Sequence, residues 1–344
     1  MTSAERKTTL LLEEFMNACR AQDLEKVQDM MSKYSEEALS RLQNEDTGQS
    51  ALMVASEVGS TDIINLLLQD GAVWNALDRY GKCAGNYASD AGHQEACDVL
   101  VHHAVRCEFL LGRVDEADKN IVEQDEYLSQ RVKYTEDGKT LLDEKGDGVM
   151  MEWERPLMQT HAQIITGGSQ RKRVLNVGFG MGVIDGILQK EYNPDLHVII
   201  EAHPDVYERM KREGWDKLDN VRICFGKWQI EMPKLIEEGV QFDGIFFDTY
   251  GEHWRDMEDF HSMMIRVLDK PHGVYSFFNG LSPDNIFFHG VACECAKIQL
   301  SQLGLTSEFA ACEIRVSDDE WKGISRKYWF GDTYYLPIVT WSNN

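Results

Sequence analysis

The sequence predicts a helical repeat array over residues 1–115, followed by an α/β domain with a parallel sheet over residues 116–344. A 33-residue spacing of small and apolar residues predicts the array. Short apolar strands that alternate with helical patterns from about residue 173 predict the sheet. A glycine-rich turn directly after the first of these strands indicates that a ligand binds there, because glycine lets a ligand approach the backbone closely.

The 344-residue chain carries 35 Lys and Arg against 58 Asp and Glu, which is a formal net charge of −23. Sequence-independent binding to nucleic acid is disfavoured, because it requires a surplus of cationic side chains. Binding to anionic membranes is disfavoured for the same reason. The charge favours a cationic partner, whose encounter rate a negative field would raise. The alternative interpretation is that the charge only keeps the protein soluble.

The first thirty residues do not have the pattern of a signal peptide, because Glu13 and Glu14 follow a short apolar run at residues 10–12. No later stretch approaches the length of a membrane helix. The eight cysteines form no Cys-x-x-Cys pair, so we expect reduced thiols in a cytoplasmic or nuclear protein. We expect no metal site, because Cys293 and Cys295 lack a histidine at the usual ligand spacing.

Five positions of the N-terminal third recur 33 residues later, which is the period of ankyrin repeats. They are Gly48, Ala51, Ala55, Gly59 and Leu67, repeated as Gly81, Ala84, Ala88, Gly92 and Leu100. A more degenerate repeat precedes them, so the array has about two and a half units. Because each unit buries its apolar face only against a neighbour, we expect the array to dock on the rest of the chain or on a partner. It serves either as a protein-binding surface or as a structural cap.

The first strand of the α/β domain, residues 174–177, leads into a turn with three glycines, Gly178, Gly180 and Gly182. The second strand, residues 197–200, ends in Glu201, which is placed to accept hydrogen bonds from the hydroxyls of a ribose. A dinucleotide fingerprint would require a glycine at position 183, where this chain has Val183. The pattern more closely resembles the glycine motif of Rossmann-like, S-adenosylmethionine-dependent methyltransferases.

The remaining strands extend this resemblance. Residues 221–225 precede Gly226, Lys227 and Trp228, where an adenine would lie against main chain and an aromatic ring. Residues 242–247 bring Asp248 to the edge where open α/β sheets bind ligands. We expect a fifth strand near 273–278, a helix around 285–303, and an antiparallel hairpin of residues 309–316 and 334–341. Seven strands that end in such a hairpin are typical of the class I methyltransferase fold.

An unusual apolar stretch, residues 149–158, precedes the first strand and contains Glu154 among Met150, Trp153 and Met158. Considered alone, Glu154 could simply pair with a nearby cation. Together with residues 177–181 and 242–250, however, this stretch resembles guanidinoacetate methyltransferase at three separate sites. The ankyrin segment, with Glu201-Ala202-His203 after the second strand, resembles the type IV protein arginine methyltransferases more closely. Those enzymes methylate the internal, δ (N5) nitrogen of arginine.

The resemblance implies two catalytic carboxylates, Glu154 to orient the guanidinium and Asp248 to accept its proton. This agrees with the chemistry, because a protonated guanidinium has delocalised lone pairs and is a poor nucleophile. Two carboxylates hold it, localise its charge and offset its repulsion from a cationic methyl donor. The remaining acceleration would come from alignment of the reacting atoms.

The resemblance also implies S-adenosylmethionine as the cofactor and a set of residues that contact it. The set is Tyr134, Met150, Met158, Gly178, Phe179, Gly180, Met181, Gly182, Val183, Ile184, Glu201, Ala202, His203, Gly226, Lys227 and Asp248. Residues 116–148 form either a linker or a partly ordered lid over the cofactor, with Tyr134 covering it.

Three functions are consistent with the sequence. The first is methylation of the δ nitrogen of arginine in a basic protein, with the ankyrin segment helping to dock it. The second is methylation of a small guanidino compound, guanidinoacetate to creatine. The third is a scaffold that binds cofactor without catalysis, which the presence of both Glu154 and Asp248 argues against. A docking repeat and an acidic chain favour the first.

Overall fold

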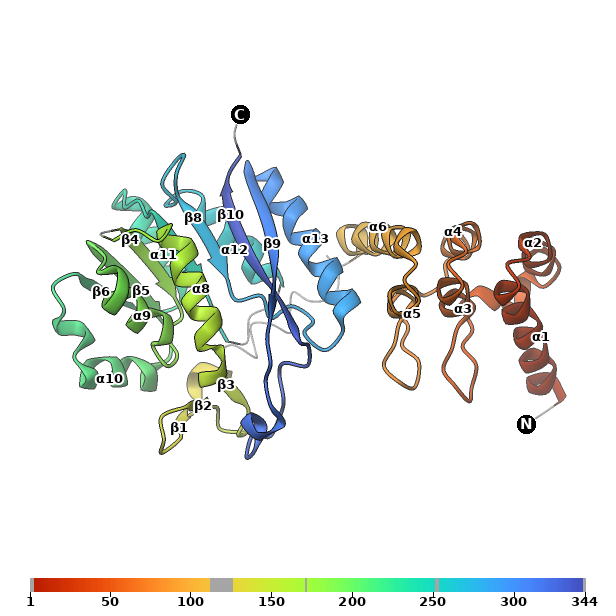
Figure 1. The fold of residues 1–344 in the computed structure, drawn as a ribbon, viewed down its shortest axis with the longest axis horizontal. Coiled ribbons are helices and arrows are strands. Elements are labelled where there is room, and N and C mark those ends of the chain that lie inside the picture. Colours follow the sequence, from red (N-terminus) through yellow and green to blue (C-terminus); the bar gives the residue numbers. More distant parts are fainter. Residues whose placement is uncertain (1–2, 112–125, 171, 251–253, 343–344) are drawn as a thin grey trace. The chain divides into compact units, whose positions relative to one another are not determined.

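The computed structural model describes residues 3–111, 126–170, 172–250 and 254–342 (Figure 1). The chain divides into two compact units. One contains the described residues up to 111 together with Asn285–Cys295, and the other contains the remaining described residues. The predicted boundary at residues 115 and 116 lies outside the described residues, as does the first part of the predicted lid, residues 116–125.

The first unit consists of paired helices (Figure 1). The helices are α1 (Ser3–Arg20), α2 (Leu24–Lys33), α3 (Ala51–Glu57), α4 (Thr61–Gln69), α5 (Ala84–Asp90) and α6 (Gln94–Leu111), with short 3-10 turns at Ser35–Glu37 and Leu39–Arg41. Ala51 and Ala55 are fully buried, as the repeat pattern predicts for small residues between closely packed helices. Gly59, at φ +70°, makes the turn between α3 and α4, and a Cβ there would lie 2.6 Å from the ring of His93. The 33-residue spacing therefore reflects two successive helix pairs.

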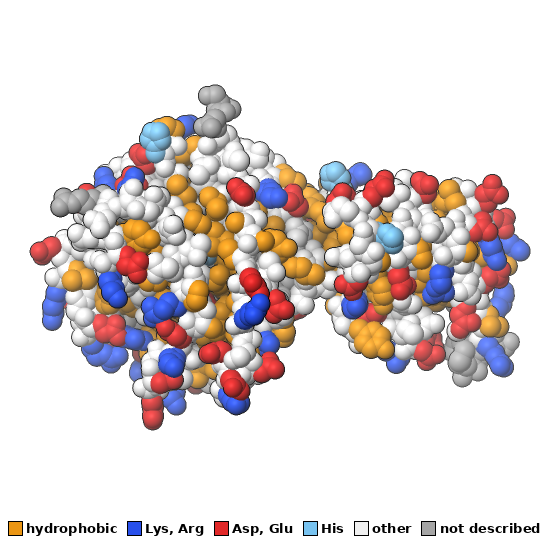
Figure 2. Space-filling view, viewed as in Figure 1, with side chains coloured by type: hydrophobic (Ala, Val, Ile, Leu, Met, Phe, Trp, Pro, Cys, Tyr) orange, Lys and Arg blue, Asp and Glu red, His pale blue; other side chains and the backbone are white. Residues whose placement is uncertain are grey.

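Acidic side chains are spread over the visible surface of both units and are not gathered in one patch (Figure 2). Within the described residues, no helix is long and apolar enough to cross a membrane. Among the same residues, no group of three or more His, Cys, Asp and Glu side chains could hold a metal ion.

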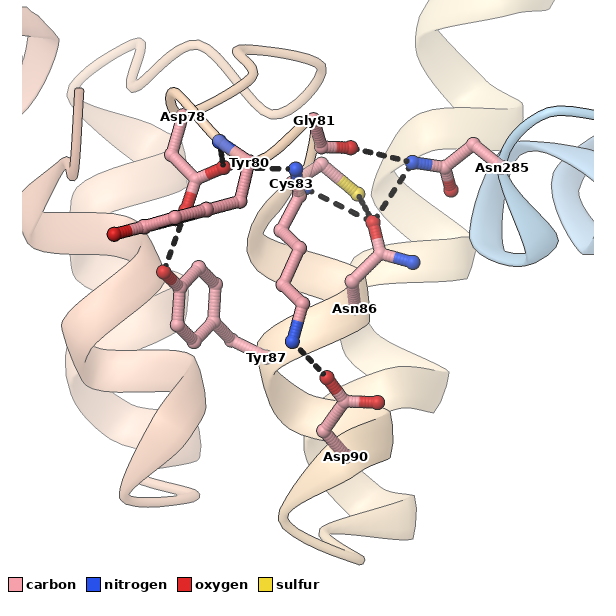
Figure 3. A network of polar contacts seen from close by, with 9 residues as sticks. Asp78, Tyr80, Gly81, Cys83, Asn86, Tyr87, Asp90 and Asn285 are labelled. Atoms are coloured by element: carbon pink, nitrogen blue, oxygen red, sulfur yellow. Dashed lines mark hydrogen bonds and ion pairs between the residues drawn. The ribbon is translucent and has the colours of Figure 1, made fainter. Parts of the chain in front are cut away.

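The repeat array packs against a segment from far along the chain, Asn285–Cys295, which includes the first half of α13 (Ile286–Gln302). Asn285 Nδ2 donates to Gly81 O at 3.3 Å and to Asn86 Oδ1 at 2.8 Å (Figure 3). Phe287 packs so closely on Gly85 that a Cβ there would lie 2.0 Å from its ring. The expected docking of the array on the rest of the chain is therefore present inside this unit.

The second unit is built on a seven-stranded sheet with the order β6-β5-β4-β7-β8-β10-β9. The strands are β4 (Arg173–Val177), β5 (Leu196–Glu201), β6 (Val221–Phe225), β7 (Gly244–Phe247), β8 (Val274–Phe277), β9 (Leu305–Glu313) and β10 (Thr333–Trp341). The first five are parallel, and β10 pairs antiparallel with both β8 and β9. The predicted terminal hairpin is thus present, although β9 begins at Leu305, directly after the turn at Gly304, and not at residue 309.

Helices cover both faces of the sheet. They are α8 (Arg155–Thr166), α9 (Val183–Ile187), α10 (Pro204–Glu213), α11 (Trp228–Glu237) and α12 (Trp254–Met264), with a π turn at Leu188–Tyr192 and 3-10 turns at Trp215–Lys217 and Asp318–Trp321. Val174 of β4 packs with residues of α8, α9 and α10, whereas its neighbour Leu175 packs with residues of α11 and α12. Alternate residues of a strand face opposite sides, so these helices form two separate cores.

A small antiparallel sheet precedes the large one: β1 (Lys133–Tyr134), β2 (Thr140–Leu142) and β3 (Gly148–Met151). The 3-10 turn Glu152–Glu154 follows β3 and leads into α8. In the large sheet the chain runs outward from β4 through β5 to β6, and then returns to the other side of β4 as β7. The loops after β4 and β7 therefore diverge at the position where open α/β sheets bind ligands.

Candidate active site

A cavity of about 790 Å³ lies at the carboxyl edge of the parallel strands. Its floor contains residues from the ends of β4, β5, β6 and β7, namely Gly178, Phe179, Gly180, Glu201, Ala202, Gly226, Lys227 and Asp248. Its walls contain Met150 and Glu154 from the β3 region and Tyr328 and Phe330 from the segment between β9 and β10. The cavity is thus formed entirely within the second unit.

The glycine turn after β4 brings two strands' loops into contact. Gly178 has φ +94°, and a Cβ there would lie 1.8 Å from the carbonyl oxygen of Asp248. Any other residue would push the β4 and β7 loops apart. Gly180 has φ +55° and faces Met150, whose sulfur would lie 3.0 Å from an added Cβ. Glycine at these positions keeps the turn tight and leaves open space above the strand ends.

Glu201 connects the turns after β4 and β5. Its Oε2 accepts hydrogen bonds from the backbone N–H groups of Phe179 at 2.9 Å and Gly180 at 3.4 Å, and its Oε1 accepts from that of His203 at 2.6 Å. Burial raises the pKa of Glu201, and these N–H donors oppose that shift. A carboxylate has about four acceptor positions, so Glu201 retains capacity for a hydroxyl donor in the cavity.

Several predicted cofactor residues support the turn from behind and do not line the cavity. Met158, Val183 and Ile184 are buried in the core beneath it. Gly182 is the residue before α9, and the backbone N–H of Met181 points to the sulfur of Met150 at 3.3 Å.

Tyr134 and His203 also lie outside the cavity lining. The hydroxyl of Tyr134 donates to Gly180 O at 2.9 Å, and the guanidinium of Arg209 lies 3.7 Å from the centre of its ring. Tyr134 thereby holds the glycine turn from outside. His203 begins α10, where its Nδ1 accepts from the backbone N–H of Asp205 at 3.2 Å.

Glu154 and Asp248 face the cavity from opposite elements. Glu154 is 3% exposed, and its Oε1 accepts from Met151 N at 2.8 Å and from the Tyr328 hydroxyl at 2.5 Å. Within the described residues, neither Glu154 Oε2 nor the carboxylate of Asp248 has a hydrogen-bond partner. The cavity therefore contains unsatisfied acceptors from two carboxylates.

The two carboxylates titrate far above the ordinary range. Burial and then the charge of Asp248 raise the pKa of Glu154 to about 8, against the opposing hydrogen bonds from Tyr328 and Met151. Burial and then the charge of Asp185, which lies in α9, raise the pKa of Asp248 to about 7. Both shifts mean that the ionised carboxylates are destabilised in the empty site. A ligand that brings positive charge therefore stabilises them most. A guanidinium provides that charge and several N–H donors in fixed directions.

Three tyrosines line the cavity. Tyr127 was expected as part of the partly ordered lid, whereas sequence reasoning gave no role to Tyr250 or Tyr328. Tyr127 packs on His203 and Tyr250, with ring centres 5.0 Å and 4.6 Å apart. Tyr250 belonged to a matched motif, but no role was predicted for it. The clustering of Trp321, Tyr328, Trp329 and Phe330 in a connection between two strands was a signal for Tyr328, because such aromatic density is unusual in a surface loop.

Comparison with protein families agrees with the two predicted parts. Residues 15–110 match a model of three ankyrin repeats, and residues 123–292 match the model described as guanidinoacetate N-methyltransferase. These matches confirm the predicted combination of ankyrin-type helices with a class I methyltransferase domain.

Curated relatives named protein arginine N-methyltransferase 2 are similar to the chain along much of its length. The protein of Cryptococcus neoformans is 34% identical over 326 residues, which cover 87% of this chain and 88% of that protein. That of Saccharomyces cerevisiae is 30% identical, covering 82% and 78%. That of Yarrowia lipolytica is 40% identical over 228 residues, but these span 63% of this chain and only 47% of that protein. A solved structure, M. jannaschii TYW2 with AdoMet, has a TM-score of 0.36 at 14% identity over 61% of this chain and 84% of its own, a likeness too distant to support an inference.

Proposed function

The chain belongs to the protein arginine N-methyltransferase 2 family, and from this premise we propose that it methylates the δ (N5) nitrogen of arginine residues in a protein substrate. The methyl donor is S-adenosylmethionine. The observation that carries the proposal is the convergence of open carboxylate oxygens from Glu154 and Asp248 on the cavity that also contains the glycine turn. One cavity can then hold both a guanidinium and a methyl donor.

The floor of the cavity fits S-adenosylmethionine. The glycine turn leaves space that a Cβ would fill, and Glu201 keeps acceptor capacity for a ribose hydroxyl. Gly226 and Lys227 line the same floor after β6, where the adenine would lie against main chain. When bound, the sulfonium supplies an electrophilic methyl group.

Glu154 and Asp248 perform the steps that the protein contributes. Glu154 holds the guanidinium through Oε2 and draws its positive charge away from the nitrogen to be attacked. Asp248 accepts the proton that this nitrogen loses as its new bond to the methyl carbon forms and the carbon–sulfur bond breaks. The products are δ-methylarginine and S-adenosylhomocysteine. Alignment of the reacting atoms in a closed cavity contributes the rest of the acceleration.

Two considerations support the δ nitrogen over the terminal ones. Residues 123–292 match the guanidinoacetate N-methyltransferase model. In creatine, the methylated form of guanidinoacetate, the methyl group is on the nitrogen that carries the carbon chain. The δ nitrogen is the counterpart of that atom in arginine. It carries a single hydrogen, so a second methylation of the same nitrogen is not expected.

The proposal is tested by incubating the protein with methyl-labelled S-adenosylmethionine and an arginine-rich basic protein, followed by complete hydrolysis to amino acids. We expect the label in δ-monomethylarginine. Label in ω-methylarginine would contradict the choice of nitrogen. Label only in creatine, when guanidinoacetate is offered in parallel, would instead establish the small-molecule function.

We further propose that the ankyrin unit docks the protein substrate. Tyr80, Leu77 and Val73 are exposed by 81%, 46% and 47% in and beside the loop that precedes α5, on a unit whose charge suits a basic partner. Because Asn285–Cys295 packs on the repeats within this unit, deleting the repeats would uncover Phe287 and Phe288. A full-length Tyr80→Ser variant is the cleaner test. We expect the KM of this variant to rise for a protein substrate and to stay unchanged for a short arginine peptide. If the variant and the wild type have the same KM for the protein substrate, the ankyrin unit is a structural cap and not a docking surface.

A further inference from the structure

The segment between β9 and β10, residues 314–332, forms one wall of the cavity. It is attached to the turn between β2 and β3: Ser325 N donates to Gly146 O at 2.9 Å, and Ser325 Oγ donates to Lys145 O at 2.9 Å. Two segments about 180 residues apart in sequence are therefore fixed to each other at the end of the cavity that contains Glu154. We call this the acceptor end, and the end that contains Glu201 the cofactor end.

Tyr328 projects from this wall toward Glu154. Its ring packs against Trp153 and Trp321, with ring centres 5.8 Å and 5.0 Å away. On another side, a Cβ added to Gly148 would lie 2.9 Å from the ring carbon Cε1. These contacts hold the ring so that its hydroxyl donates to Glu154 Oε1 at 2.5 Å.

The hydroxyl decides how Glu154 is presented. With the N–H of Met151 and the hydroxyl of Tyr328 both on Oε1, that oxygen is occupied, and Oε2 remains for a ligand. The other ionisable groups that act on Glu154 are Asp248, which opposes its charge, and Tyr334, whose own pKa the charges of Asp248 and Glu154 raise. The neighbouring Arg155 offers no compensation, because its guanidinium pairs with Glu152.

We propose that Tyr328 is a positioning residue for the acceptor substrate: its hydroxyl holds Glu154 Oε1 so that Oε2 meets the guanidinium, and it offsets the repulsion between Glu154 and Asp248. The inference rests on the proposed function of Glu154 as the guanidinium-binding carboxylate. Tyr328 acts through Glu154 and needs no contact of its own with the substrate.

Loss of the hydroxyl has a defined consequence for the pH dependence. The hydrogen bond from Tyr328 lowers the pKa of Glu154, so its removal raises that pKa further. A guanidinium binds to the ionised carboxylate, so the acid limb of kcat/KM moves to higher pH. A hydrogen bond to a charged group is worth enough to move a pKa by about one unit. We therefore expect kcat/KM to fall about tenfold at pH values below the limb.

The test compares Tyr328→Phe with Tyr192→Phe, which makes the same chemical change in the π turn after α9, outside the cavity lining. Phenylalanine keeps the ring in its aromatic surroundings. We expect Tyr328→Phe to shift the acid limb up by about one pH unit with unchanged cofactor affinity, and Tyr192→Phe to match the wild type. Superimposable profiles for Tyr328→Phe and wild type would overturn the inference.

A second variant and a second measurement separate this inference from the proposed function. Gly148→Ala keeps the hydroxyl but crowds the ring of Tyr328, and we expect a shift in the same direction. The carboxyl ¹³C signal of Glu154, assigned by its absence in Glu154→Gln, reports the pKa without any turnover. If the signal moves in Tyr328→Phe but no methylarginine forms, the positioning contact stands and the proposed function fails. If methylarginine forms and the signal does not move, the proposed function stands and the positioning role fails.

Discussion

The buried carboxylates at the two ends of the cavity differ in their hydrogen-bond partners. At the cofactor end, Glu201 is held by backbone N–H groups from the turns after β4 and β5. At the acceptor end, Glu154 Oε2 and the whole carboxylate of Asp248 have no partner within the described residues. In the first arrangement, the charge of the carboxylate is already stabilised before a ligand arrives. In the second, the ionised carboxylates repel each other unless they bind protons or a cation.

This difference assigns different tasks to the two ends. A carboxylate that backbone N–H groups fix in place, with one acceptor position still open, is a rigid receptor for a neutral hydroxyl group, and it contributes mainly to affinity. Two unsaturated carboxylates that resist ionisation bind a guanidinium selectively, because a neutral ligand of similar shape would leave their repulsion in place. The selectivity for a cation thus comes from the instability of the empty acceptor end.

The largest effect is expected from Glu154→Gln. The amide keeps the size of the side chain but removes the charge that binds the guanidinium, so kcat/KM should fall by about 10³-fold, in line with the loss of one partner from a buried, hydrogen-bonded charge pair. Cofactor affinity, measured by calorimetry, should stay within about threefold of the wild type, because the cofactor end is separate.

Glu152→Gln is the matched control for this variant. Glu152 lies two residues earlier, and its carboxylate pairs with Arg155 near the surface. It should retain wild-type activity. A Glu154→Gln enzyme with near-normal kcat/KM would show that the acceptor end does not depend on the charge of Glu154.

A smaller effect, on cofactor affinity and not on turnover, is expected from Glu201→Gln. The amide places an N–H₂ group against backbone N–H donors and offers fewer acceptors to a ribose, so the dissociation constant for S-adenosylmethionine should rise about 10- to 100-fold. The value of kcat at saturating cofactor should change little. Glu208→Gln, on the exposed side of α10, is the control, because its carboxylate pairs with Lys211 at the surface. A fall in kcat with unchanged cofactor affinity would assign Glu201 to the acceptor end instead.

The two ends also differ in how much the sequence revealed. The cofactor end lies on consecutive strand-turn-helix units, so Gly178, Gly180 and Glu201 were recognisable from local spacing alone. Glu154 precedes the first strand by about twenty residues, and only the resemblance to a known family connected it with Asp248. Tyr328 was not predicted, because its contact with Glu154 spans 174 positions and depends on the fold of a loop.

The same limit applies to the fold. The alternation of strands and helices predicted the parallel sheet and the terminal hairpin, but the placement of β10 between β8 and β9 is set by long-range pairing. The helix around 285–303 was also expected, yet its pattern did not show that Asn285–Cys295 packs on the repeats. Phe287 and Phe288 are apolar in either arrangement, so hydrophobicity alone does not choose between the two cores.

The last expected effect concerns the free energy of unfolding in the absence of ligands, and it does not involve catalysis. Burial and the charge of Asp248 raise the pKa of Glu154 from 4.5 to about 8, so the folded protein binds this proton more tightly than the unfolded chain. The stability of the wild type therefore falls as the pH rises between these values. Glu154→Gln removes the penalty, and at pH 8.5 the variant should gain about 4 kcal/mol, or about 10 °C in the melting temperature of the second unit. The gain should shrink to about 2 kcal/mol at pH 6 and vanish only below pH 4.5, where Glu154 is protonated in both the folded and the unfolded chain. Glu201→Gln should show no such gain, because its amide N–H₂ group would face backbone N–H donors that the carboxylate now satisfies. Melting curves at the two pH values measure the difference, and a Glu154→Gln variant no more stable than wild type at pH 8.5 would mean that the acceptor end is not strained in the empty protein.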